Sequence, residues 1–359
     1  FYFFSVLLSM NIFANIEILK LDPGFKISIF ASDLDQPRQM IEGKNGTIFI
    51  GERSGQIIAL LDSDGNGQAD SKRVIADDLT YSTGVSIFEG DLYFSEISKI
   101  WKIQDIENWL QKNSSGFPEK ILVTQDLPED KWHGWKWLQH NAEGDIYTNV
   151  GAPCNICISE NPQYASIIRL RDDNWEYVAR GVRNSVGFDF HPETSKLYFG
   201  DNGRDWLGDD SPACELNRVD EDGLFYGFPY QHALNVKDPE YGDLESGYDY
   251  VDPILELGAH VAPTGLAFYD GEMFPKKYKN NIFITLHGSW NRSKKVGYKV
   301  IRVVLDGEGD VVDTKDFISG WLDGETVLGR PAAPLIISDG SLLISDDKAN
   351  VIYRITYKQ

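Results

Sequence analysis

The sequence is short of basic residues. Lysine and arginine number 34 against 55 aspartates and glutamates, which gives a formal net charge of −21. Binding to DNA or RNA depends on a basic surface that releases counterions from the phosphates, so this balance argues against a nucleic-acid partner. It favours a neutral or cationic partner, although an acidic surface can also serve only to keep a protein soluble.

Cysteine is also scarce, with three residues, Cys154, Cys157 and Cys214. Three cysteines cannot form a four-cysteine zinc site. Haem attachment through Cys154 and Cys157 would need a histidine where Ile158 stands. In an exported protein Cys154 and Cys157 are candidates for a short disulfide, and free thiols are the alternative.

A membrane-spanning apolar segment is missing as well. Residues 1–14 (FYFFSVLLSMNIFA) carry no charge but fall short of the ~20 residues that cross a bilayer as a helix. They resemble the hydrophobic region of a signal peptide, with Ala14 as the candidate cleavage position, and a buried first strand is the alternative. No initiator methionine or basic region precedes them, so we expect an incomplete signal peptide. We therefore expect a periplasmic or secreted protein that is not an integral membrane protein.

Methionine is rare and glycine is common. The chain has 3 Met, 33 Gly and 13% aromatic residues, a composition that favours strands and tight turns over long helices. One unit recurs along the chain: a turn containing glycine, a short strand, a gap, and a second strand rich in Ile, Val and Arg. Its copies cover residues 45–62, 89–103, 143–170, 194–219, 279–305 and 339–355.

These copies predict an all-β fold, a six-bladed β-propeller that forms one domain over residues 21–359. A strand pair cannot bury both of its faces alone, so the units must stack on one another, and closing the ring removes exposed sheet edges. A strand expected at residues 26–31 is a candidate to complete the last blade. A helix is expected at residues 106–112.

One loop has the oxygen pattern of a calcium site. Residues 61–70 (LDSDGNGQAD) place Asp62, Asp64 and Asp70 around a glycine turn, as at the start of an EF-hand loop. The twelfth position is Arg73, where a bidentate glutamate would be needed. A calcium ion and a solvated turn both remain open for this loop.

Several cationic side chains stand where blade strands begin or end at one mouth of the ring. Taken singly, each is more often a packed histidine or an arginine paired with a surface carboxylate. Converging arginines favour a polyanionic ligand such as a small tricarboxylate, because the guanidinium fork binds carboxylates in bidentate fashion. The residues are Arg38, Arg183, Arg292, Arg330, His133, His260 and His287.

A series of motifs stands in a fixed order between about residue 23 and about residue 355. They are HGWKWL with GDIYTNVGAPCNIC, GVRNSVGFDFHP, GDNGRD with ELNRV, YGFP, AHVAPTGLAFYDGEMFP, HGSWNR with GYKV, and GRP with DGSLLISDD. In order and spacing they resemble the soluble sugar dehydrogenases that depend on pyrroloquinoline quinone (PQQ), closest to the L-sorbosone and pyranose dehydrogenase branch.

The resemblance implies PQQ held over the propeller axis, with a calcium ion bridging protein and cofactor. It implies that His133 is the general base, that Arg183 and Asn184 stand beside the reactive quinone carbonyl, and that the backbone carbonyls of Gly203 and Arg204 bind calcium. The further PQQ contacts that it implies are Arg38, Thr264, His287, Arg292 and Arg330.

This assignment implies a quinoprotein oxidoreductase that acts on a sugar or a sugar-derived aldehyde or alcohol. A histidine suits the removal of the hydroxyl proton while hydride leaves carbon, and calcium with Arg183 would stabilise the charge that develops on the quinone oxygen. Trp132, Trp135 and Trp206 are candidates to stack on the cofactor or on a sugar, with core packing as the alternative. Because the chain has no Cys-x-x-Cys-His segment, the electron acceptor is expected to be a separate soluble cytochrome or a quinone.

Two positions depart from the glucose-oxidising branch. Trp132 precedes the base where that branch has an acidic residue, and HGSWNR offers no lysine for the cofactor, so Arg292 is a candidate substitute. Two rival functions stay open. One is a calcium-dependent, lactonase-like hydrolase centred on Asp201, Asn202 and Asp205. The other is a non-catalytic propeller that binds glycans.

Overall fold

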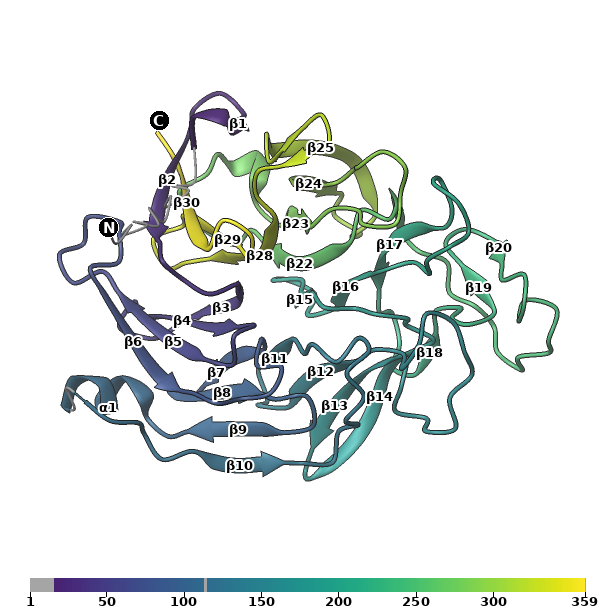
Figure 1. Ribbon diagram of the computed structural model, residues 1–359, viewed down its shortest axis with the longest axis horizontal. Helices are drawn as coiled ribbons and strands as arrows, with labels where there is room; N and C mark the ends of the chain where they lie inside the picture. Colours follow the sequence, from purple (N-terminus) through teal and green to yellow (C-terminus); the bar gives the residue numbers. More distant parts are fainter. Residues whose placement is uncertain (1–15, 113–114, 359) are drawn as a thin grey trace, which may run out of the picture.

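The computed structural model describes residues 16–112 and 115–358. Six sheets lie side by side in a ring around a central axis, and α1 (Ile106–Lys112) lies at the outer edge (Figure 1). This arrangement confirms the six-bladed β-propeller and the helix predicted at residues 106–112. The expected signal peptide at residues 1–14 lies outside the described residues.

Each blade is an antiparallel sheet with four principal strands, numbered here from the axis outwards. The first strands contact one another around the axis. They are β3 (Pro37–Glu42), β7 (Val85–Phe88), β11 (Leu138–His140), β15 (Phe188–Phe190), β22 (Pro263–Phe268) and β28 (Pro331–Ile336). The second strands are β4 (Ile48–Glu52), β8 (Asp91–Ser95), β12 (Ile146–Val150), β16 (Leu197–Asp201), β23 (Ile282–Leu286) and β29 (Leu342–Asp346).

The third strands are β5 (Ile57–Leu61), β9 (Ile100–Ile103), β13 (Ser166–Arg171), β17 (Ala213–Arg218), β24 (Lys299–Leu305) and β30 (Val351–Tyr357). The fourth are β6 (Ser71–Ala76), β10 (Ile121–Thr124), β14 (Asn174–Arg180), β21 (Leu255–Ala259), β25 (Val311–Ser319) and β2 (Phe25–Ala31). Short elements extend these sheets or lie between them: β1 (Lys20–Leu21), β18 (Leu224–Phe225), β19 (Gln231–His232), β20 (Val236–Lys237), β26 (Leu322–Asp323), β27 (Thr326–Val327), and the 3-10 turns Ile16–Ile18 and Lys276–Tyr278.

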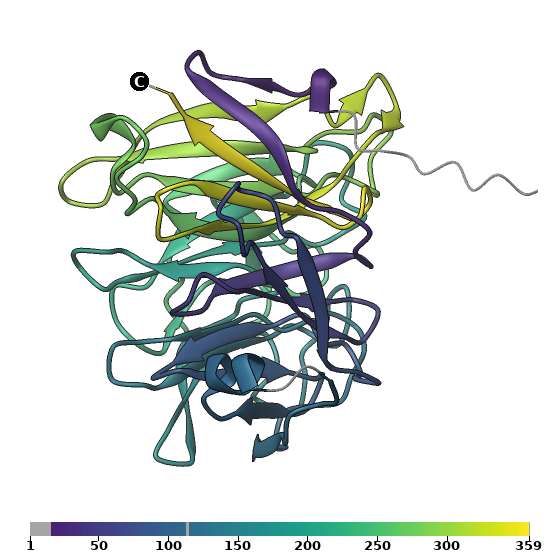
Figure 2. The ribbon, with the colours of Figure 1, turned by 90° about the vertical axis from the view of Figure 1, so that its left-hand side faces the viewer.

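The ring is closed by the two ends of the described chain. Strand β2 pairs antiparallel with β30, so the last blade combines three strands from the end of the chain with one from its start (Figures 1 and 2). The register joins Lys26 to Thr356 and Ser28 to Arg354. The predicted role of the strand at residues 26–31 is therefore confirmed. Because the last blade is completed in this way, the ring is closed and every blade has a neighbouring blade on each side.

The core lies between neighbouring blades. Strands β4, β12, β16, β23 and β29 are buried along their whole length, as expected for a strand packed on both faces. Between the last two blades, Phe25 makes edge-to-face contacts with Phe274, Tyr278 and Phe317, with ring centroids 4.8–5.2 Å apart. Aromatic packing of this type adds to the burial of apolar area and fixes the closing strand.

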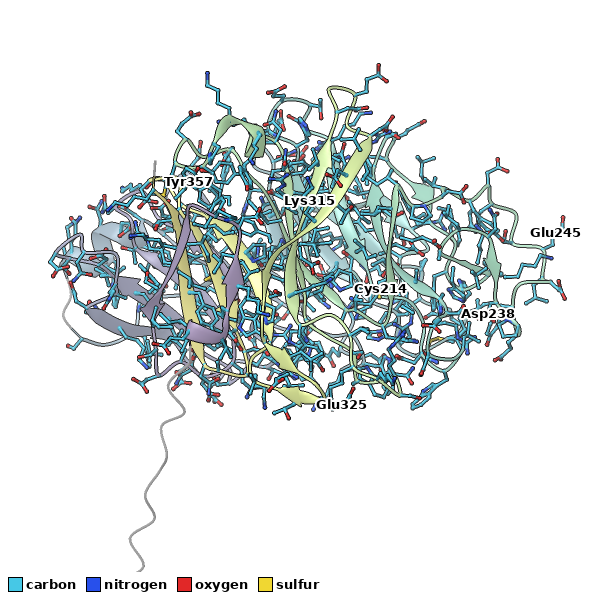
Figure 3. All side chains as sticks on the ribbon, turned by 90° about the horizontal axis from the view of Figure 1, so that it is seen from above. Cys214, Asp238, Glu245, Lys315, Glu325 and Tyr357 are labelled. Carbon is cyan, nitrogen blue, oxygen red and sulfur yellow. A yellow bond between two sulfur atoms is a disulfide. The ribbon has the colours of Figure 1, made fainter. Side chains whose placement is uncertain are left out.

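The connections emerge at two different faces. Those from second to third strands, and from each fourth strand to the next blade, reach one face, which we call the cavity face. The calcium-like loop between β5 and β6 joins a third strand to a fourth, so it lies on the opposite face. In Figure 3 Glu325, between β26 and β27, marks the cavity face, whereas Glu245 lies far out on the extension that carries β19 and β20. Among the residues described, no helix is long and apolar enough to cross a bilayer.

Candidate active site in the axial cavity

A cavity of about 320 Å³ opens on the axis at the cavity face. Most of the predicted catalytic, cofactor and metal residues that line it come from connections at this face: His133 follows β10 and Arg183 and Asn184 follow β14, between blades, and Gly203 follows β16, within a blade. The inner strands β3 and β22 contribute Arg38 and Thr264. Among the residues described, His287, Arg292, Arg330 and Arg204 are not part of this wall.

His133 is held as a neutral imidazole with a defined proton. Its Nδ1 lies 2.8 Å from the carbonyl oxygen of Ala152, a contact that requires Nδ1–H as the donor. Burial and the nearby charge of Arg183 lower the pKa of His133 to about 3, and the bond to Ala152 only partly opposes this. The Nε2 lone pair is therefore available to accept a proton at neutral pH, as a general base requires.

Arg183 is buried beside His133, and all five of its N–H donors have acceptors. Nε and Nη2 bind the backbone and side-chain oxygens of Asn155 at 2.9 and 2.8 Å, and Nη2 also reaches Asp205 at 3.1 Å. Nη1 binds the carbonyl oxygens of Asn202 and Gly203 at 3.1 and 2.9 Å. Arg183 thus contributes a fixed positive charge to the cavity. A ligand oxygen can take one of its N–H groups only by displacing a protein acceptor.

The loop closed by the Cys154–Cys157 disulfide supports both of these residues. Ala152, just before the loop, accepts from His133, and its N–H donates to the carbonyl oxygen of Arg183 at 2.8 Å. Asn155, between the two cysteines, accepts two bonds from Arg183 and one from the Asp205 N–H at 2.8 Å. The disulfide that the sequence left open is therefore present. The role of Asn155 was not predicted, because only the three-dimensional contacts reveal it.

Replacing Asn155 with alanine removes the side-chain acceptor that Arg183 Nη2 and the Asp205 N–H share. Because bonds to charged groups contribute about 1.5–3 kcal/mol each, we expect the free energy of unfolding to fall by about 2 kcal/mol. Urea denaturation monitored by tryptophan fluorescence measures this change. Asn174→Ala, at the exposed first residue of β14, is the control and should lie within about 0.5 kcal/mol of wild type. Equal losses in both variants would show that Asn155 does not anchor Arg183.

A second group of cationic side chains converges on Asp347, which has no exposed side-chain surface. Arg38 Nη2 lies 2.8 Å and Arg330 Nε 2.6 Å from its carboxylate, and Arg53 Nη1 lies 3.8 Å away. His287 Nε2 adds a contact of 3.0 Å. Burial lowers the pKa of His287 to about 4, so this ring is a neutral donor.

The Asp347 cluster therefore holds three guanidinium groups against one carboxylate. The Nε atoms of Arg38 and Arg53 are buried and have no hydrogen-bond partner among the described residues. Although burial acts to raise it, the pKa of Asp347 is held well below its usual range by Arg38 and His287. The cluster has an excess of positive charge and meets the cavity through Arg38, which suits a ligand with several carboxylates.

Arg53 and Asp347 were not among the predicted site residues. Arg53 follows β4, and its guanidinium lies 4.7 Å from the ring centroid of Trp135, which stacks on Tyr81 at 4.2 Å. Trp135 also lines the cavity, as predicted for a residue that stacks on a ligand. Asp347 belongs to the quoted motif DGSLLISDD. An aspartate directly after a second strand was the available signal for this position, but two of its arginine partners, Arg38 and Arg53, lie far away in sequence.

The remaining predicted residues have protein partners of their own. Thr264 Oγ1 donates to the carbonyl oxygen of Ala332 at 2.8 Å, and this bond joins two blades at the cavity floor. Asn184 N–H donates to Asp201 at 2.7 Å, whereas its buried Oδ1 has no partner among the described residues. Asn184 thus brings to the cavity wall a side-chain oxygen that is free to accept a hydrogen bond from a ligand.

Two predicted residues lie in ion pairs away from the cavity wall. Arg204 pairs with buried Asp238, and Arg292 pairs with Asp210 at 2.8 Å and with the carbonyl oxygen of Asp209. Arg292 therefore joins two surface loops, and its contact with the cofactor stays a prediction. In Figure 3 Asp238 lies toward the outer edge of the molecule, while Cys214, another residue of the cavity wall, lies within the ring.

The site fits an organic anion better than it fits a metal ion. Unpaired donors and an excess of arginine charge match PQQ, whose acidic groups need cationic partners. The carbonyl oxygen of Gly203, predicted to bind calcium, already accepts from Arg183. Among the described residues, three carboxylates lie close enough to one another to bind one metal ion. They are Asp62, Asp64 and Asp70, on the opposite face.

Comparison with known proteins places this site in a family. The TrAA12-like family matches residues 19–239 and 231–319. The chain belongs to the TrAA12-like family. This match confirms the resemblance to the PQQ-dependent sugar dehydrogenases that the motifs indicate. An uncharacterized protein of Borreliella burgdorferi is 34% identical over 354 residues, which cover 95% of this chain and 91% of that protein.

Two solved structures share the fold of this TrAA12-like chain. The holo PQQ domain of pyranose dehydrogenase from Coprinopsis cinerea superimposes with a TM-score of 0.78 at 19% identity, covering 94% of this chain and 97% of that one. An iodide structure of the Trichoderma reesei enzyme of carbohydrate-active family AA12 superimposes with a TM-score of 0.80 at 18% identity, covering 95% and 98%. At these identities the likeness establishes the fold.

Proposed function

We propose that this chain is a PQQ-dependent dehydrogenase that oxidises a sugar or a sugar-derived aldehyde or alcohol. The observation that carries the proposal is a neutral histidine with a free Nε2 inside a cavity that is bordered by excess arginine charge. Membership of the TrAA12-like family supports it. L-sorbosone and glucose-type aldoses are the first substrates to try, since the motifs resemble the enzymes that act on them.

His133 would remove the hydroxyl proton of the substrate through Nε2. The bond from Nδ1–H to Ala152 fixes the tautomer, and burial keeps the ring unprotonated until the substrate arrives. Bound PQQ would supply the acceptor for the hydride of the substrate carbon. Arg183, held by Asn155 and two carbonyl oxygens, places a fixed positive charge where negative charge develops during this step.

Arg38 would contact the carboxylates of PQQ directly. Arg53 and Arg330, which pair with the same Asp347 as Arg38, would add positive charge beside it. Asn184 offers its unused Oδ1. Calcium would bind the carbonyl oxygens of Gly203 and Arg204, where the Gly203 oxygen keeps a second lone pair beside the one that accepts from Arg183. Dependence on calcium and binding of PQQ are tested separately.

The Cys154–Cys157 disulfide supports a protein that acts in an oxidising compartment, which we take to be the periplasm or the exterior. Electrons would pass from the reduced cofactor to a soluble cytochrome or a quinone. The hydrolase alternative has less support, because its carboxylates are already engaged. Asp201 accepts from the backbone N–H groups of Arg183 and Asn184, and Asp205 accepts from Arg183.

A reconstitution assay tests the proposal. Protein without residues 1–14 is mixed with PQQ, with or without calcium, and assayed for dye reduction with a panel of aldoses and sorbosone. We expect reduction that requires both PQQ and sugar. Calcium chelation will show whether the reaction needs the ion: unchanged activity would mean that no calcium ion, at Gly203 and Arg204 or elsewhere, is essential. Failure to bind PQQ would contradict the proposal and favour a hydrolase or a glycan-binding protein.

A further inference from the structure

Two exposed tryptophans stand at the rim of the axial cavity. Trp206 is 68% exposed and Trp290 70%, the largest exposed fractions among the large hydrophobic residues described. Their rings meet edge to face with centroids 5.5 Å apart. Trp290 also lines the cavity, so the pair continues its wall out to the surface. Large aromatic side chains left in water beside a cavity mark a binding surface, because water exposure of each ring is unfavourable.

The loops that carry the pair are tied together. Trp206 lies between β16 and β17, and Trp290 lies between β23 and β24. Asn291 donates to Asp205 at 3.2 Å, the Ser293 N–H donates to Asp209 at 2.9 Å, and Arg292 pairs with Asp210 at 2.8 Å.

A further bond anchors the first loop to the wall of the cavity. His260 donates through Nε2 to the carbonyl oxygen of Gly208 at 2.8 Å. Trp206 has a left-handed backbone with φ of 72°, a conformation that is costly for a tryptophan and persists only where the surroundings fix it. The two loops are therefore tied together before any ligand arrives, and ordering them adds little to the entropic cost of binding.

The size of the cavity indicates which ligand reaches the pair. At about 320 Å³ it lies at the small end of the ~300–1,000 Å³ range of ligand pockets, and PQQ would fill part of it. Only the reacting end of a sugar then fits beside His133. Any further sugar units must leave through the rim, where Trp290 and Trp206 offer ring faces to the apolar C–H faces of pyranose rings.

The charge of the protein indicates whether the sugar is acidic or neutral. Asp209 and Asp210 follow Trp206 in its loop, and Asp210 is compensated by its ion pair with Arg292. The whole chain carries a net charge of −21, and this overall charge would repel an acidic polysaccharide. A neutral oligosaccharide would meet aromatic faces and hydrogen-bond acceptors with no such penalty.

Resting on the proposed function, we propose that Trp206 and Trp290 form a platform that binds the outer units of a neutral oligosaccharide whose reacting end enters the axial cavity. The substrate class is then an oligosaccharide or a chain end. Trp206, outside the cavity wall, is the residue that discriminates chain length.

Calorimetric titration of PQQ-free protein with maltotetraose, cellotetraose and xylotetraose tests the platform without relying on catalysis. We expect at least one to bind, and we expect Trp206→Ala to weaken that binding about tenfold. Trp206→Phe should retain most of it. Phe117→Ala is the matched control, because Phe117 is 61% exposed in the connection between β9 and β10, on the opposite face. No binding by wild type, or equal affinity in Trp206→Ala, would overturn the proposal.

Kinetics of the PQQ-loaded enzyme separate the platform from the proposed function. The loss in kcat/KM caused by Trp206→Ala should be about tenfold larger for the bound tetrasaccharide than for its monosaccharide, and should appear in KM. If no sugar is oxidised but a tetrasaccharide still binds through Trp206, the proposed function fails and the platform stands. If Trp206→Ala instead slows only the reduction of a protein electron acceptor such as cytochrome c, the tryptophan pair contacts that acceptor. This result would overturn the platform.

Discussion

Replacing His133 with alanine is expected to lower kcat by about 10²–10⁴-fold while PQQ stays bound, because removal of a positioned general base has an effect of this size. The imidazole presents an unprotonated Nε2 inside the cavity, and its Nδ1–H bond to Ala152 fixes the ring. Arg183 is also in the wall, but it is a permanent cation with every N–H engaged, so it cannot take over as base.

His133→Asn is the sharper variant, since its amide nitrogen can keep a bond to Ala152 but has no basic character. A large fall in kcat with unchanged PQQ affinity would separate proton removal from positioning. His140→Asn is the control: this half-buried histidine is part of β11 and packs on Phe88 and Tyr93, away from the cavity wall. Full activity of His133→Asn would contradict the assignment of the base.

The pH dependence of the reaction follows from the same histidine. Burial and Arg183 lower its pKa to about 3, so the base form is fully present between pH 5 and 8, and kcat/KM should show no loss from His133 in that range. The free energy of unfolding depends on pH in the opposite direction to that expected for a salt-bridged histidine, because the pKa of His133 is lowered by folding. The unfolded chain takes up a proton near the ordinary pKa of about 6.5, so this contribution is complete above that pH and is lost as pH falls toward 3.

Asp347→Ala is expected to lower the free energy of unfolding by about 3–5 kcal/mol, because it leaves buried arginines without their counter-charge. Arg38 and Arg330 lie within 2.8 Å of this carboxylate, Arg53 lies nearby, and the Nε2 atom of His287 loses its hydrogen-bond partner. The pKa of Asp347 is held below its usual range, so this contribution is fully present above pH ~4 and declines only in stronger acid.

Urea denaturation at pH 7 measures this loss. Asp243→Ala is the matched control, since Asp243 also pairs with a cation, Lys237, but is 96% exposed, and surface pairs contribute about 0–1 kcal/mol. If both variants lose the same small amount, Asp347 is not the centre of the arginine cluster. A loss confined to Asp347→Ala would support the view that this carboxylate organises the cationic side of the cavity.

The sequence was sufficient to predict the ring, and it offered β2 as a candidate to close it. Alternating apolar residues, glycine turns and their six recurrences reflect strands that pack on both faces, and β2 was identified by its own alternation. The same motifs located His133, Arg183 and Asn184 near one another, because each lies in a connection at the cavity face.

The centre of the cationic cluster was beyond sequence reasoning. Arg38 and Asp347 are separated by almost the whole chain and meet because the ring closes. Arg292 has the same chemistry as Arg38, yet it pairs with Asp210 because its loop turns toward its neighbour at the surface. Local sequence indicates which side chains are cationic. The tertiary fold decides which carboxylate each one meets.

The most direct test of the account is the absorbance spectrum of the PQQ-loaded protein under anaerobic conditions, before and after addition of sugar. The account predicts that a substrate sugar bleaches the bound quinone in a single turnover, and that His133→Asn binds PQQ equally well but is bleached far more slowly. A protein that binds no PQQ, or whose bound PQQ no sugar reduces, would contradict the central claim.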